Sequence, residues 1–154
     1  MSHFLLFTSH FNRDKGIDIG RLSLNHINEG SQSIWLALSS VESKQDREGF
    51  HKRGGMIPPN YRTLNAKKYT VNLTPIPMPS NKGVRGNFYQ ILPFKITTDC
   101  GGKRSDFGIH LDANVPGSMG CIVLDQRRFT SFENTVCRLK NKQISELPLF
   151  IQYS

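Results

Sequence analysis

His110 and Cys121, eleven residues apart, carry side chains whose chemistry combines directly. A thiolate is a strong nucleophile, and a nearby imidazole takes the proton of the thiol or stabilises the resulting anion. Gly120 has no side chain, so the carbonyl group of a substrate could approach the backbone closely there. The backbone amides of Met119, Gly120 and Cys121 would then stabilise an oxyanion. This short segment therefore contains the parts of a cysteine acyl-transfer site.

The same two residues also admit interpretations without catalysis, because a single cysteine is commonly a small buried apolar residue and a single histidine is commonly structural. A metal site formed by Cys121, His110 and a second histidine is a further alternative. The chain has no CxxC pair to favour structural zinc, and we expect neither a metal nor a cofactor. The odd count of three cysteines argues against a disulfide framework. We expect Cys100 to be a surface thiol and Cys137 to lie beside the core.

The segments around the pair predict how the two side chains are positioned. In residues 106–112 the odd positions are apolar and the even positions are polar or glycine, which is the pattern of a β-strand. His110 and Asp112 are then expected on a polar face, opposite the core. Residues 113–120 are rich in turn formers, and the chain returns to apolar residues at 121–124. A loop of this length can double back and bring the cysteine to the histidine.

The rest of the 154-residue chain predicts a single domain, 1–154, that is mainly β. Thirteen glycines and eight prolines indicate many turns, and apolar residues recur with a period of two. We expect strands at residues 3–8, 21–26, 33–41, 68–73, 88–96 (interrupted at Pro93) and 147–153, and a loop at 42–53. In the strand at 33–41, Ile34, Leu36 and Leu38 share one face and Trp35 lies on the other.

One main α-helix is expected after Cys121. The run from Thr130 to Glu133 fits a capping box, in which the threonine hydroxyl caps the first turn and the glutamate lies three residues later. Phe132, Val136 and Leu139 then fall on one apolar stripe at helical spacing.

The charge of the chain is basic, with 20 Lys and Arg against 12 Asp and Glu and a net charge of +8. The basic residues are scattered, which fits a solvated surface, although a basic chain also suits an anionic partner such as a cell-wall polymer or nucleic acid. Nucleic acid is unlikely as a partner, since aromatic and basic residues are not interleaved in the way that stacks bases. No apolar stretch approaches the roughly 20 residues of a membrane span. The apolar run at residues 4–7 is too short for a signal peptide, so we expect synthesis in the cytoplasm.

Two motifs in this chain resemble a known family. Residues 104–110, RSDFGIH, followed by residues 117–124, GSMGCIVL, look like the signature of L,D-transpeptidase-like (YkuD-type) proteins: a histidine on a strand, a loop, then Ser/Thr-x-Gly-Cys and an apolar run. Upstream, residues 54–61, GGMIPPNY, are similar to a Pro-rich turn of the same family. The short interval between histidine and cysteine is most similar to the small phage and effector-like branches. The resemblance covers roughly residues 20–153.

The resemblance implies a mixed β-sandwich with one helix after the catalytic cysteine, and cysteine-dependent acyl transfer on the stem peptides of peptidoglycan. Cys121 would form a thioester, and transfer to an amine or to water would make the protein an L,D-transpeptidase or an L,D-carboxypeptidase. His110 would act as general base and acid. A backbone carbonyl commonly orients this histidine in the family, and Asp112 is a local alternative. Ser118 would hydrogen-bond near the thiol or the substrate.

Three positions depart from the family pattern. Met119 and Val123 stand where many members have histidine and arginine, and Asn60 stands where glycine is usual. Without a charge at position 123, another cation must hold the substrate carboxylate, and Arg104 is the first choice because it leads into the histidine strand. A solvent-exposed turn is the alternative for Arg104. Met119 would line the substrate site.

The resemblance also implies where the protein acts, namely at the periplasm or cell wall, which a chain without a signal would reach by another route. A non-catalytic basic module on the same scaffold, binding cell-wall polymer or, less readily, nucleic acid, is the alternative function. The oligomeric state is not predicted.

Overall fold

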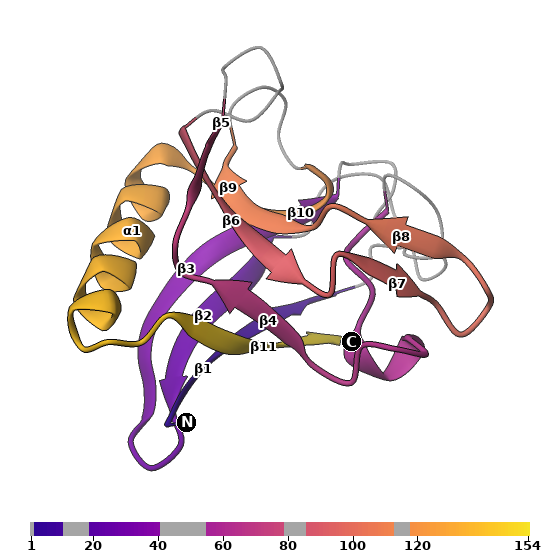
Figure 1. Ribbon diagram of the computed structural model, residues 1–154, viewed down its shortest axis with the longest axis horizontal. Helices are drawn as coiled ribbons and strands as arrows, with labels where there is room; N and C mark the ends of the chain where they lie inside the picture. Colours follow the sequence, from indigo (N-terminus) through magenta and orange to yellow (C-terminus); the bar gives the residue numbers. More distant parts are fainter. Residues whose placement is uncertain (1, 11–18, 41–54, 79–85, 113–117) are drawn as a thin grey trace.

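The computed structural model describes residues 2–10, 19–40, 55–78, 86–112 and 118–154 (Figure 1). The loop expected at 42–53 and most of the loop expected between His110 and Cys121 lie outside these residues. The elements, in chain order, are β1 (His3–Ser9), β2 (Gly20–His26), β3 (Gly30–Ser40), the 3₁₀ turn η3 (Asn60–Arg62), β4 (Tyr69–Asn72), β5 (Ile76–Met78), β6 (Gly86–Leu92), β7 (Lys95–Thr97), β8 (Lys103–Ser105), β9 (Gly108–Leu111), β10 (Ser118–Leu124), α1 (Gln126–Asn141) and β11 (Glu146–Tyr153).

Within the described residues, eight strands close into a mixed β-barrel in the order β4-β11-β1-β2-β3-β10-β9-β6. Closure occurs at β4, which pairs with β11 on one side and with β6 on the other. The β1–β11 and β9–β10 pairs are parallel, and the other pairs around the barrel are antiparallel. The mainly β class with one helix after Cys121 is confirmed, but the expected sandwich is observed as a barrel because its two edges are joined through β4.

The barrel is filled by the side chains of alternate strand residues. Leu5 and Phe7 on β1, and Leu22 and Leu24 on β2, are almost fully buried in one continuous core. The strands expected at 3–8, 21–26, 68–73 and 147–153 are confirmed as β1, β2, β4 and β11, and the alternation expected at 21–26 is confirmed. For β3 the two faces are both apolar, and it is Trp35 that points into the core while Ile34 remains 59% exposed.

The helix α1 contributes the apolar stripe predicted for it, since Phe132, Val136 and Leu139 are all buried. It lies along one side of the barrel (Figure 1). The ring of Trp35 packs edge-on against the ring of Phe132. The predicted capping box at 130–133 is wrong. The helix begins at Gln126. The carboxylate of the N-cap residue Asp125 accepts a hydrogen bond from the backbone N–H of Arg128, so the helix begins earlier in the chain than a cap at Thr130 would place it.

The predicted break at Pro93 is confirmed, because β6 ends at Leu92 and β7 begins at Lys95. β7 and β8 form a separate two-stranded sheet on the side of the barrel away from α1 (Figure 1). This small sheet leads directly into β9, the strand that carries His110. No helix in the described part of the chain is both long enough and apolar enough to cross a membrane.

Candidate active site around Cys121 and His110

Cys121 and His110 lie on neighbouring parallel strands of the barrel. Ile122 of β10 pairs with Ile109 of β9, and Val123 pairs with His110. Continuing this register by one residue places Cys121 opposite Gly108, two residues from His110 along β9. Diagonal neighbours of this kind are roughly 7–8 Å apart on a sheet. The barrel therefore brings the two residues to the same region of one wall.

A bulge in β10 sets the position of Cys121. Ser118 pairs with Ser40 of β3, and the next paired residue, Ile122, faces Ser39. One step along β3 thus corresponds to four steps along β10, which leaves residues 119–121 outside the ladder. Bulges redirect side chains and are frequent beside active sites. This bulge places the candidate nucleophile where the strand is irregular on its β3 side.

The thiol of Cys121 is half-buried and not part of a disulfide. Its Sγ lies 3.5 Å from the backbone carbonyl oxygen of Asp106, at the turn from β8 into β9. Asp106 has a positive φ of 66°, a left-handed conformation that Asp adopts more readily than most residues. The hydroxyl of Ser105 donates a hydrogen bond to the carboxylate of Asp106 (2.9 Å). The thiol is therefore held against the beginning of the histidine strand while part of it remains accessible to solvent.

His110 is expected on the face of its strand opposite the core; it alternates with the core residue Ile109 along β9, and it is nevertheless buried, with 5% of its surface exposed. Nδ1 lies 2.8 Å from the carbonyl oxygen of Leu111. A carbonyl only accepts hydrogen bonds, so Nδ1 carries the proton and Nε2 of the neutral ring is left as an acceptor. A backbone carbonyl thus orients the ring, as the resemblance implied. Asp112, half-buried two residues further on, acts on the ring through its charge.

Burial lowers the pKa of His110 below its ordinary value of 6.5, and this effect exceeds the opposing effects of the Leu111 carbonyl and the Asp112 charge. The imidazole is consequently neutral near pH 7, which is the form that accepts a proton from a thiol.

Phe88 is a site residue that sequence reasoning missed. Its ring stacks on the imidazole of His110, with centroids 5.8 Å apart and planes 29° from parallel. A Cβ on Gly108 would lie 2.2 Å from Cζ of Phe88, so the ring occupies the space that any larger residue would need. Gly108 is therefore required for the stack, and the aromatic ring shields one side of the imidazole from water. Only the pairing of β6 with β9 reveals this contact.

The position of β6 is fixed by the helix. Asn87 and Tyr89, on either side of Phe88, both donate to Oε2 of Glu133 on α1, at 2.7 and 2.6 Å. Burial and the hydrogen bond to Glu133 raise the pKa of Tyr89 above its ordinary value of 10.0, so its hydroxyl stays protonated and remains a donor.

Arg104, the expected carboxylate ligand, is 5% exposed, so the alternative of a solvent-exposed turn is wrong. Nη1 and Nη2 donate to the carbonyls of Met56 (3.1 Å) and Gly55 (2.9 Å), and the guanidinium lies 5.2 Å from the ring centre of Phe107. Burial lowers its pKa, while charges that include Cys121 raise it. Arg104 therefore ties the turn at 55–56 to the strand that approaches the thiol, and its charge acts on Cys121.

Several other predicted residues are placed only in part. Ser118, Met119 and Gly120 belong to β10, but their side chains lie outside the described part of the structure. The contacts expected of the Ser118 hydroxyl and of Met119 therefore stay predictions. Cys100 is exposed, as expected. Cys137 is exposed as well, so the prediction that it lies beside the core is wrong. Among the described residues no group of three His, Cys, Asp or Glu could hold a metal ion.

Comparison of the chain with family models, with curated proteins and with solved structures found no significant match. The resemblance to L,D-transpeptidase-like proteins therefore rests on the residues quoted for it.

Proposed function

We propose that the protein is a cysteine acyltransferase of L,D-transpeptidase-like type that acts on peptidoglycan stem peptides, as an L,D-transpeptidase or an L,D-carboxypeptidase. The observation that carries the proposal is the β9–β10 pair. It combines a partly accessible thiol in a bulge with a buried, neutral imidazole whose Nε2 is left to accept a proton. The mainly β class and the helix after Cys121 agree with the family scaffold that the motifs imply, although that scaffold is a sandwich and these strands close into a barrel.

The reaction would begin when His110 accepts the thiol proton at Nε2 and Sγ of Cys121 attacks the carbonyl at the L-centre of the diamino acid in the stem. The backbone amides of residues 119–121 would stabilise the oxyanion. His110 then returns the proton to the amine of the departing D-residue, which leaves a thioester on Cys121. A second amine or a water molecule, deprotonated by His110, attacks the thioester and releases the free thiol.

In this proposal the protein acts at the periplasm or cell wall and needs no cofactor. The departure at Val123 keeps a second function under consideration, a non-catalytic module that binds cell-wall polymer through its basic surface. Val123 pairs with His110 and is 1% exposed, and its apolar side chain does not supply the charge that an arginine would provide there.

The direct test compares the wild-type protein with Cys121→Ala and with the matched control Cys137→Ala, which makes the same chemical change at an exposed cysteine on α1. Each is incubated with muropeptides, and the products are analysed by mass spectrometry. We expect loss of a terminal D-residue, or peptide dimers, with the wild type and the control, and no product with Cys121→Ala. Equal activity in Cys121→Ala would exclude the thioester mechanism, and binding without any turnover in all three would favour the non-catalytic module.

A further inference from the structure

A pocket on the small β7–β8 sheet carries two cations that the site described above does not use. Its volume is about 360 Å³, and it is lined by Asn65, by both strands of the hairpin and by no acidic residue. In the register of this hairpin, Lys95 faces Ser105 and Lys103 faces Thr97, so these four side chains share one face. Both lysines are exposed.

The two lysines are placed to act on one ligand group. They are diagonal neighbours across the hairpin, a spacing of roughly 7–8 Å that long side chains span, so both ammonium groups reach the same point. Neither has an ion-pair partner among the described residues. The hairpin therefore offers two uncompensated positive charges beside the hydroxyls of Thr97 and Ser105.

Arg104 cannot be the most accessible cation of this region, because it points to the opposite face of the hairpin. Ile96 and Arg104 pair with one another there and are 1% and 5% exposed. The guanidinium of Arg104 is held on that side by its hydrogen bonds to the carbonyls of Gly55 and Met56. Charge that faces solvent in the pocket thus comes from the lysines.

The pocket is lined by a residue that precedes, in the chain, the residue that contacts the candidate nucleophile. Ser105 lines it, and the carbonyl of the next residue, Asp106, lies 3.5 Å from Sγ of Cys121. The pocket and the thiol therefore both adjoin the turn from β8 into β9. The carboxylate of Asp106 accepts a hydrogen bond from the hydroxyl of Ser105, which lines the pocket. Because this negative charge repels an anionic ligand in proportion to the charge of the ligand, it disfavours a dianion more than a monoanion.

We propose that the pocket between Lys95 and Lys103 is a subsite that binds a carboxylate of the peptide ligand. The inference rests on the proposed function for the position of the ligand, and it names the group by which the ligand is held. The lysine ammonium groups donate charge-assisted hydrogen bonds to the carboxylate oxygens, and the hydroxyls of Thr97 and Ser105 are within the same pocket.

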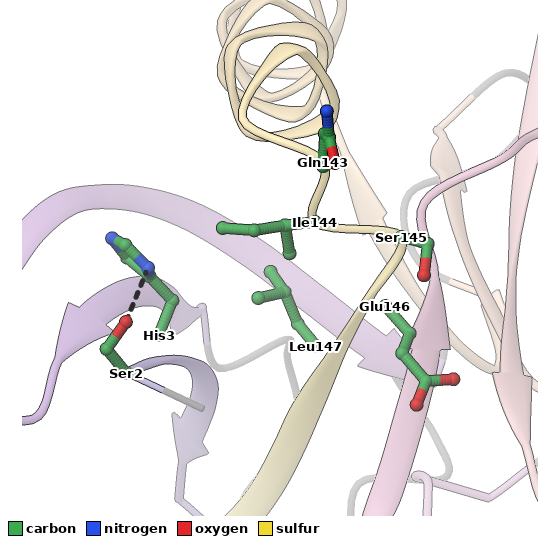
Figure 2. A pocket seen from close by; sticks show the side chains of 7 residues that line it. All are labelled: Ser2, His3, Gln143, Ile144, Ser145, Glu146 and Leu147. Carbon is green, nitrogen blue, oxygen red and sulfur yellow. Dashed lines mark hydrogen bonds between the residues drawn. The ribbon is translucent and has the colours of Figure 1, made fainter.

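Another pocket shows what distinguishes this one. It lies between the beginning of β1 and the link from α1 to β11, has a volume of about 290 Å³, and includes the carboxylate-bearing Glu146. Figure 2 shows Ile144 and Leu147 on the side of this pocket towards His3, which is hydrogen-bonded to Ser2. With an apolar side, an acidic residue and no lysine in its lining, it has neither the charge nor the link to Cys121 that carries the proposal.

The test uses two synthetic peptides that differ in one carboxylate: L-Ala-γ-D-Glu-L-Lys amide, and the same peptide with the free glutamate carboxylate converted to an amide. Binding to the wild-type protein is measured by calorimetry at low and high salt. We expect the carboxylate peptide to bind at least about tenfold more tightly than its amide, and to weaken with salt. Equal affinities of the two peptides, or tighter binding of inorganic phosphate than of the carboxylate peptide, would overturn the proposal.

Two variants with the same change in net charge complete the test. Lys95→Ala with Lys103→Ala should weaken binding of the carboxylate peptide about tenfold and leave the amide unaffected, whereas Lys140→Ala with Lys142→Ala, at the end of α1, should bind as the wild type does. Unchanged binding in the first variant, or an equal loss in the second, refutes the subsite. Cys121→Ala should bind normally, so failure of the proposed chemistry and failure of the subsite are separate results.

Discussion

Two walls of the same barrel are built differently. Between β1 and β2 the pairing runs without interruption from His3–His26 to Thr8–Arg21, and every second residue enters the core. Between β3 and β10 the ladder skips residues 119–121, and β9 begins after a left-handed residue, Asp106. The regular wall contributes mainly stability. The irregular wall is where a thiol and an imidazole lie on adjacent strands.

The walls also differ on their outer faces. In the regular wall the outward residue Arg21 of β2 is exposed, as expected for the outside of a barrel. On β9 and β10 the outward residues His110 and Val123 are 5% and 1% exposed. Shielding a titratable ring on the outer face has a cost in solvation free energy. Because this burial lowers the pKa of His110, the imidazole is in the neutral state that a base requires. The difference predicts that substitutions in one wall affect stability and those in the other affect the reactivity of the thiol.

The largest effect on stability is expected in the regular wall. Leu22→Ala removes a fully buried side chain of β2 and should lower the free energy of unfolding by roughly 2–5 kcal/mol. Arg21→Ala, on the exposed face of the same strand, should change it by no more than about 0.5 kcal/mol. Urea denaturation measures both. If Leu22→Ala, still folded, altered the alkylation rate of Cys121, the division of roles between the two walls would be incorrect.

A smaller effect is expected where Phe88 lies over the histidine strand. Gly108→Ala should lower the free energy of unfolding by roughly 1–3 kcal/mol, because the new methyl group and the ring of Phe88 need the same space. Adding Phe88→Ala should recover part of this loss, which a double-mutant cycle measures. Additive losses in the cycle would show that the two residues do not compete.

The smallest effect is expected from the titration of His110. Its pKa is lowered in the folded protein, so the folded state binds a proton less readily than the unfolded chain. The stability is therefore complete above the unfolded value of about 6.5 and decreases as the pH falls through the lower folded value. His110→Gln keeps a hydrogen-bond donor and should lack this component of acid destabilisation. Identical pH dependence of unfolding in the two proteins would contradict the burial of a neutral ring.

The sequence predicts the regular wall better than the irregular one. Alternation is a local property, so the strands β1, β2, β4 and β11 and the stripe of α1 are recognised from the residues themselves. Where both faces of a strand are apolar, as in β3, alternation does not say which face is inside, and Trp35 resolves it only once α1 packs there. The helix start differs because Asp125 provides a capping carboxylate five residues before Thr130.

The candidate site follows from the sequence only as a set of residue types. His110 and Cys121 are recognisable from spacing and resemblance, but the burial of His110 and Arg104 depends on segments distant in the chain. The same is true of Phe88, which reaches His110 through strand pairing, and of the bulge at residues 119–121, which exists only relative to β3.

The pairing of sulfur and imidazole is tested most directly by the pH dependence of alkylation at Cys121. Iodoacetamide labelling is followed by peptide mass spectrometry in the wild type and in His110→Gln, with the exposed Cys100 and Cys137 as references within the same molecule. We expect Cys121 of the wild type to react rapidly below pH 7. In His110→Gln its profile should move towards that of an ordinary thiol, near pH ~8.5. A Cys121 profile that is the same in both proteins and matches the two references would contradict the account.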